Sequence, residues 1–85
     1  MFETTIRVLG VGKRISGIGA NGAYDFAPIH FAYDAKGVRG EAVGTCNIKG
    51  HQIDLWQVEP GRVYIALLSF RDYKPSACYL VEAYE

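Results

Sequence analysis

Residues 13–26 hold the side chains of this chain that are best suited to bind another molecule. Two adjacent cations, Lys13 and Arg14, precede a glycine-rich stretch, and Tyr24 and Phe26 follow it. Side chains alternate along a strand, so the two rings share one face of any strand that begins there. Cations bind phosphates and flat rings stack on bases, and the pattern therefore favours a groove for single-stranded nucleic acid.

The same segment also fits an ordinary hairpin whose aromatic rings belong to the core, because aromatic side chains in strands are often buried. Asn21-Gly22 is a strong signal for a short hairpin turn under either interpretation. The residues of this segment alone leave both interpretations open.

Length and charge narrow the choice of partner. The chain is predicted to form one domain, residues 1–85, with a core near the lower size limit for an independent fold. We therefore expect a homodimer, because dimerisation buries more apolar surface. The formal net charge is zero, whereas nucleic-acid-binding domains are typically basic. Several cations nevertheless precede residue 40, namely Arg7, Lys13, Arg14, Lys36 and Arg39.

No set of residues has the spacing of a catalytic or metal site. His30 and His51 lack a cysteine or carboxylate at ligand spacing, and no serine or cysteine pairs with a histidine and an acid. Cys46 and Cys78 form no CxxC pair; we expect buried, reduced thiols, with a disulfide as the alternative. The sequence predicts a protein without catalytic activity, metal or cofactor.

The first residues lack a basic segment followed by an apolar run, so no signal peptide is expected. No stretch approaches the roughly 18 consecutive apolar residues of a membrane span. We therefore expect a cytoplasmic protein without a membrane partner.

Most of the chain is predicted to be β-strand, because apolar and β-branched residues alternate between turn signals. The strands are predicted at residues 4–11, 23–34, 38–48, 62–71 and 77–84. Residues 49–52 are predicted to form a loop, and residues 53–57 fit either a short strand or one helical turn. Ile29 and Phe31 are assigned to the core, and Trp56 to the core or a dimer contact.

Three residues indicate that the sheet curls. Pro28 predicts an edge position or a bulge, because proline donates no hydrogen bond to a ladder. Gly40 and Gly44 predict bulges or bends within the third strand. Five strands with such kinks predict an all-β fold, a small and partly open barrel.

Two segments carry a family resemblance. In the first, a basic residue precedes Ser-Gly, a glycine-containing loop and an aromatic strand start: Arg14, Ser16-Gly17, Gly22 and Tyr24. In the second, a Pro-Gly and an apolar strand end in Ser-Phe-basic and an aromatic turn: Pro60-Gly61, Ser69-Phe70-Arg71 and Tyr73. In this order, over roughly residues 5–84, the chain resembles the single-stranded DNA-binding (helix-destabilising) proteins of filamentous bacteriophages.

The resemblance implies a five-stranded barrel of the oligonucleotide-binding (OB) type, a two-fold dimer and cooperative, sequence-tolerant coating of single-stranded DNA. It implies that Arg14 contacts phosphate, that Tyr24 stacks on bases and that Phe26 makes an apolar contact in the same groove. Tyr73 matches an aromatic that reaches DNA near a neighbouring dimer. RNA stays open as a ligand, and a phage-encoded protein would act in the host cytoplasm. The candidate nucleic-acid-binding residues are Lys13, Arg14, Tyr24, Phe26, Arg71 and Tyr73.

A second hypothesis is a small β-rich module that binds another protein through an exposed edge or an apolar face, with a purely structural glycine loop. The zero net charge favours this hypothesis. The order of the motifs and the basic N-terminal half favour DNA binding.

Overall fold

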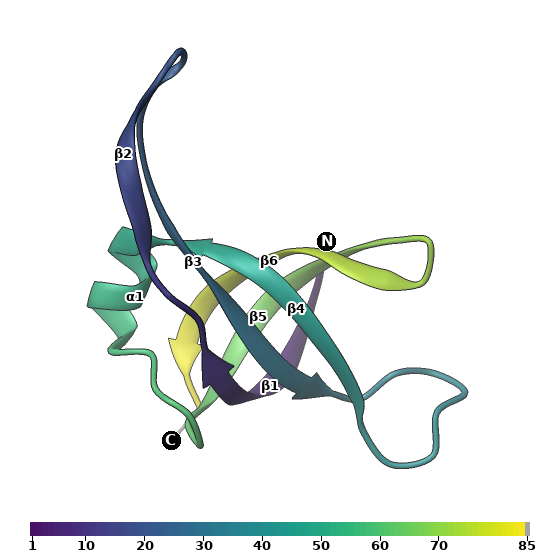
Figure 1. Ribbon diagram of the computed structural model, residues 1–85. Helices are drawn as coiled ribbons and strands as arrows, with labels where there is room; N and C mark the ends of the chain where they lie inside the picture. Colours follow the sequence, from purple (N-terminus) through teal and green to yellow (C-terminus); the bar gives the residue numbers. More distant parts are fainter. Residues whose placement is uncertain (85) are drawn as a thin grey trace.

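In the described part of the chain, the fold consists of six antiparallel β-strands and one short helix (Figure 1). The computed structural model describes residues 1–84. Its elements are β1 (Phe2–Val11), β2 (Ile15–Gly19), β3 (Gly22–Tyr33), β4 (Ala42–Lys49), α1 (Gly50–Trp56), β5 (Val63–Arg71) and β6 (Lys74–Ala83). The predicted all-β class is confirmed, with β2 as a strand that the sequence did not predict.

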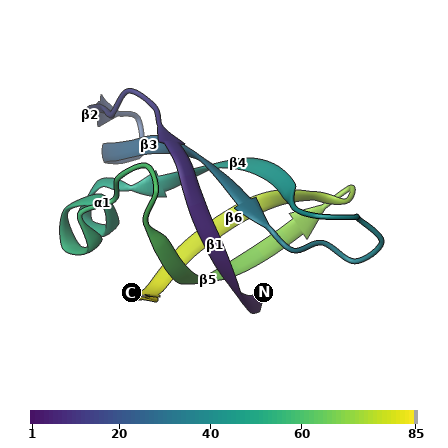
Figure 2. The ribbon, with the colours of Figure 1, turned by 90° about the horizontal axis from the view of Figure 1, so that it is seen from below.

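The strands form one strongly curved sheet in the order β2-β3-β1-β5-β6, and β4 pairs with the free side of β3 (Figure 2). The curvature brings β4 and β6 side by side, and a side chain at Gly44 of β4 would collide with the ring of Pro75 on β6. No ladder of hydrogen bonds joins these two strands within residues 1–84. The sheet is therefore open along this seam.

Helix α1 closes part of the seam through one buried side chain. The amide nitrogen of Gln52 donates a hydrogen bond to the Leu80 carbonyl at 3.1 Å, and the Leu80 N–H donates to the Gln52 amide oxygen at 2.7 Å. Gln52 thus forms with β6 the pair of hydrogen bonds that a neighbouring strand would form. These two bonds also satisfy the buried amide group of Gln52.

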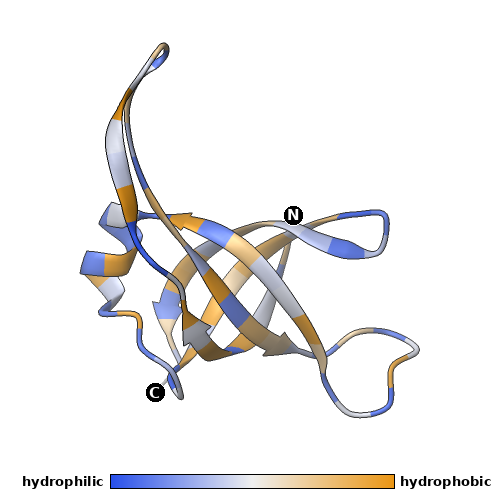
Figure 3. Ribbon diagram, in the orientation of Figure 1, coloured by the Kyte–Doolittle hydropathy of each residue, from blue (hydrophilic) through white to orange (hydrophobic). Residues whose placement is uncertain are grey.

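The core lies inside the curve of the sheet and is formed by buried apolar residues of β1, β3, β4, β5 and β6. Figure 3 shows apolar and polar residues interspersed along these strands. The largest fully buried side chains of the core include Tyr64, Phe31 and Ile29. Full burial of such a side chain contributes about 1.5–3 kcal/mol. The assignment of Ile29 and Phe31 to the core is confirmed. Trp56 is partly buried and packs against the core, and its carbonyl accepts a hydrogen bond from the Tyr64 hydroxyl at 3.0 Å.

The two thiols belong to the same core. Cys46 and Cys78 are buried and free, as expected. Burial raises the pKa of both thiols, and that of Cys78 reaches about 12. Both therefore stay protonated and unreactive at neutral pH.

The hairpin after β1 differs from its prediction. Residues 15–19 pair with β3 instead of forming a loop, and the turn residues are Ala20 and Asn21. Gly22 follows with φ +107°, a conformation that glycine adopts without strain. Two-residue hairpin loops usually have positive φ within the turn, whereas here the positive φ falls on Gly22, the first residue after it.

Two other details of the strands correct the prediction. The third predicted strand, 38–48, begins only at Ala42, and Gly40 lies in the preceding loop with φ +80°. Pro28 lies in an inner strand, not an edge strand, at the point along β3 where β1 ends and β2 begins. The Pro28 carbonyl accepts a hydrogen bond from the Gly12 N–H, on the side of β3 that faces β1 and β2. An N–H at position 28 would point to this same side, in the gap between the β1 and β2 ladders, so its absence interrupts neither ladder. Residues 53–57 follow the helical alternative up to Trp56.

Candidate nucleic-acid interface

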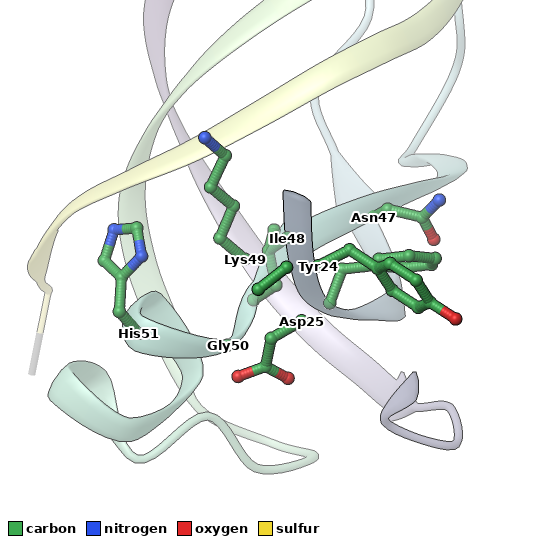
Figure 4. A pocket seen from close by; sticks show the side chains of 9 residues that line it. Tyr24, Asp25, Asn47, Ile48, Lys49, Gly50 and His51 are labelled. Atoms are coloured by element: carbon green, nitrogen blue, oxygen red, sulfur yellow. The ribbon is translucent and has the colours of Figure 1, made fainter. Parts of the chain in front are cut away.

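A pocket of about 570 Å³ lies where β3 runs beside the end of β4 and the start of α1 (Figure 4). Tyr24 and Asn47 lie at one end of this pocket, and Lys49 and His51 lie at the other. We call it the aromatic pocket. Its lining residues are Ala23, Tyr24, Asp25, Phe26, Asn47, Ile48, Lys49, Gly50 and His51.

The two rings that the sequence singled out lie together in the aromatic pocket. The centroids of Tyr24 and Phe26 are 6.1 Å apart and their planes are tilted by 42°. Both rings occupy the face of β3 opposite to Ala27 and Ile29, which are fully buried. Tyr24 is 43% exposed and Phe26 is partly buried. The interpretation of both rings as core residues is therefore wrong.

The Tyr24 ring can take its position only because residue 17 is a glycine. Gly17 of β2 is the cross-strand partner of Tyr24, and a β-carbon at position 17 would collide with the tyrosine hydroxyl. The phenol ring thus lies across the backbone of β2. The glycine-rich sequence has a local structural purpose, since it lets an exposed ring rest on a neighbouring strand.

Polar and basic residues of β4 flank the rings. Lys49 is the cross-strand partner of Phe26, and Asn47 is that of Pro28, so all four share the outer face of the sheet. His51 follows in the first turn of α1 and is exposed. Lys49 is not among the site residues predicted from the sequence, because residues 49–52 are predicted there to form a loop, whereas Lys49 is the last residue of β4. Extending the strand alternation from Asn47 by two residues would have found it.

Arg14 is not a free cation. Its Nε and Nη2 atoms donate hydrogen bonds to the two carboxylate oxygens of Asp25 at 2.8 and 2.6 Å. Its Nη1 and Nη2 atoms also donate to the two oxygens of Asp54 at 2.8 and 3.1 Å. Asp25 lies on β3 and Asp54 on α1, so the guanidinium joins the hairpin to the helix. Arg14 is exposed, but its charge is already paired.

The hydrogen bonds among Arg14, Asp25 and Asp54 shift the pKa of each of the three side chains. Hydrogen bonds from Arg14 hold the pKa of Asp25 and of Asp54 below the ordinary carboxyl value of 3.8, and they raise the pKa of Arg14 further. Nearby His51 lowers the pKa of Asp25 slightly more. All three groups are therefore ionised at neutral pH, and the cluster carries one excess negative charge.

Lys13, Arg71 and Tyr73, three other predicted site residues, lie apart from the aromatic pocket. Lys13 is exposed in the short connection between β1 and β2. Arg71 and Tyr73 lie at the tip of the β5–β6 hairpin, on the far side of the molecule from the β2–β3 hairpin (Figure 1). Tyr73 is 99% exposed, as expected for a turn residue.

The β5–β6 turn is a two-residue hairpin loop in which neither central residue is glycine. Asp72 and Tyr73 both have left-handed φ values, +53° and +66°, between the paired residues Arg71 and Lys74. Tyr73 also lines a second hollow of about 710 Å³ between this hairpin and the loop after β3. We call it the apolar hollow; its lining includes Phe2, Tyr33, Val38, Val43, Phe70 and Tyr73.

Within residues 1–84 no cluster of three or more histidine, cysteine or acidic side chains is arranged to hold a metal ion. In the same part of the chain, no helix has the length and apolar character needed to cross a membrane. Comparisons with protein-family models, with curated protein sequences and with solved structures each gave no match.

Proposed function

We propose that the protein binds single-stranded DNA without sequence preference, with RNA as a weaker or equivalent ligand. The observation that carries the proposal is the aromatic pocket, where Tyr24 and Phe26 share an open face with Lys49 directly opposite. Every base has a flat surface, so exposed rings stack on any sequence, and neighbouring cations bind the phosphates between the bases.

The connectivity supports an OB-type fold for this function. β1, β3, β4, β5 and β6 are the five barrel strands in this proposal, and β2 is an outgrowth of the first connection. OB folds bind oligonucleotides on the face of their second and third strands and with the loops after their first and fourth strands. These positions correspond to the aromatic pocket on β3 and β4, to Lys13 and Arg14, and to the turn that carries Tyr73.

The same proposal includes a homodimer that coats DNA cooperatively. The rings of Phe2 and Phe70 stack at 5.2 Å and remain partly exposed beside the apolar hollow. Exposed apolar surface of this kind marks a site of association. A dimer would also supply Tyr73 and Arg71 to a strand that passes from one subunit to the next, as the resemblance to the phage proteins implies.

A salt titration of binding to poly(dT), followed by intrinsic tyrosine fluorescence, tests the function. We expect quenching on binding and a negative slope of log affinity against log salt concentration. Lys49→Gln should reduce the magnitude of that slope by about 0.7, the effect of one lost phosphate contact on a single strand. Arg39→Gln, which removes an equal charge from an exposed position of the loop after β3, outside the aromatic pocket and the apolar hollow, is the matched control and should leave the slope unchanged.

Protein binding is the second candidate function, and the apolar hollow is the observation that favours it. A protein ligand would occupy that hollow and would not use the aromatic pocket. Absence of binding to both poly(dT) and poly(U) at low salt would refute nucleic-acid binding and leave the protein-interaction hypothesis.

A further inference from the structure

The hydrogen bonds of Arg14 leave neither two-donor edge of its guanidinium free for a phosphate. A guanidinium binds an anion with two parallel hydrogen bonds along one of two edges, either Nε with one terminal nitrogen or both terminal nitrogens together. Asp25 occupies the first edge and Asp54 the second. A phosphate can form a paired contact with Arg14 only after one carboxylate leaves.

The two carboxylates differ in how readily they can leave. Asp25 lies on the same hairpin as Arg14 and packs against the α-carbon of Gly50, where a β-carbon would collide with both side chains of the pair. Its side chain is 40% exposed. The Asp54 side chain is 66% exposed and comes from a separate element, α1. Asp54 is therefore the exchangeable partner, because its departure frees one edge and leaves Asp25 to orient the arginine.

We propose that Asp54 is an internal competitor for nucleic-acid phosphate, and that binding of a phosphate at Arg14 displaces Asp54 and breaks the ion pair that joins Arg14 to α1. This inference rests on the proposed function and adds a residue that sets its strength. The Asp54 carboxylate occupies the edge that a phosphate needs, and its bond to Arg14 must break before the arginine contributes to affinity. Arg14 then contributes less to affinity in the native chain than an unpaired arginine would.

The test compares labelled oligothymidylate binding over a range of salt concentrations for the wild type, Asp54→Asn, Arg14→Ala and the double variant. We expect Asp54→Asn to raise affinity by up to about fivefold, the range of an exposed ion pair. The same variant should steepen the salt slope by about 0.7, because one more phosphate contact forms. In the Arg14→Ala background the Asp54→Asn change should have no effect, since the cycle isolates the interaction between the two residues.

Glu59→Gln is the matched control, because it removes an equal negative charge from an exposed residue close in sequence to α1. An increase of affinity equal to that of Asp54→Asn would overturn the competition, because it would show a general charge effect. Equal affinities of wild type and Asp54→Asn would also overturn it while leaving DNA binding intact. Absence of binding by every variant would overturn the proposed function and the competition with it. Melting curves of each variant confirm that a folded protein is compared.

Discussion

At Gly17 and Gly50 the absence of a side chain makes room for a functional one. The ring of Tyr24 rests on the first, and the Arg14–Asp25 ion pair rests on the second. Neither glycine has a positive φ, so both are explained by close approach and not by backbone conformation. Each glycine thus fixes the position of one candidate binding group.

Replacing Tyr24 by alanine should weaken binding of poly(dT) by about 1–3 kcal/mol, the cost of one lost base stack. The salt slope should stay the same, because no phosphate contact is removed. Titrations of fluorescence quenching at several salt concentrations measure both quantities. Tyr84→Ala removes a ring that is also exposed but lies outside the aromatic pocket, and it should bind like the wild type. Wild-type affinity in a folded Tyr24→Ala protein would remove this ring from the site.

At the scale of elements, the β2–β3 hairpin extends beyond the curved sheet, and its base is held by Arg14. The arginine joins this hairpin to α1, and α1 in turn joins β6 through Gln52. Three elements that are distant in sequence are thereby tied together around the seam between β4 and β6. The orientation of the aromatic pocket depends on these ties, since β3, β4 and α1 all contribute to its lining.

This arrangement predicts a loss of stability in acid. The folded pKa values of Asp25 and Asp54 lie below 3.8, so their ion pairs with Arg14 stabilise the fold at every pH above that value. The contribution is lost as the pH falls through the folded pKa values. The melting temperature of Arg14→Gln should therefore lie below that of the wild type near neutral pH, and the two should converge in acid.

Circular dichroism melts from neutral pH down to below pH 3.8 measure this convergence. Arg39→Gln, which removes a charge from the loop after β3, should melt like the wild type throughout. A constant difference between Arg14→Gln and wild type at every pH would show that the arginine acts through packing and not through its carboxylates.

For the whole molecule, the apolar hollow predicts the oligomeric state. We expect sedimentation equilibrium at micromolar concentration to give twice the 9.4 kDa mass of the chain. Val43→Glu should shift the mass toward the monomer, because it places an unpaired charge in the hollow. Leu55→Glu, at an exposed position of α1, should not. A monomer mass for the wild type would contradict the dimer.

The period-two alternation of side chains is a local property, and it correctly placed Tyr24 and Phe26 on one face and Ile29 and Phe31 on the other. The partners of Arg14 could not be predicted in the same way, because Asp25 and Asp54 lie 11 and 40 residues away in the sequence. Only the folded sheet brings them together.

Strand β2 was not predicted because its pairing with β3 also depends on the folded structure. Glycines at positions 17 and 19 disfavour a strand by local propensity, yet both pair with β3 because the tight turn at Ala20 and Asn21 holds them opposite it. The boundary between β4 and α1 was also misplaced, and with it Lys49. Element boundaries depend on tertiary contacts such as the one between Gln52 and Leu80, which no local pattern contains.

The backbone of the β5–β6 turn implies a trade-off between folding and recognition. A left-handed conformation costs most residues with a β-carbon about 1–2 kcal/mol more than it costs glycine, and aspartate tolerates it better than most. Tyr73→Gly should therefore raise the melting temperature, and Asp72→Gly should change it less. If the exposed ring of Tyr73 stacks on bases, only the change at position 73 should weaken binding to poly(dT). Wild-type affinity for poly(dT) in the Tyr73→Gly variant would show that the Tyr73 ring does not stack on bases.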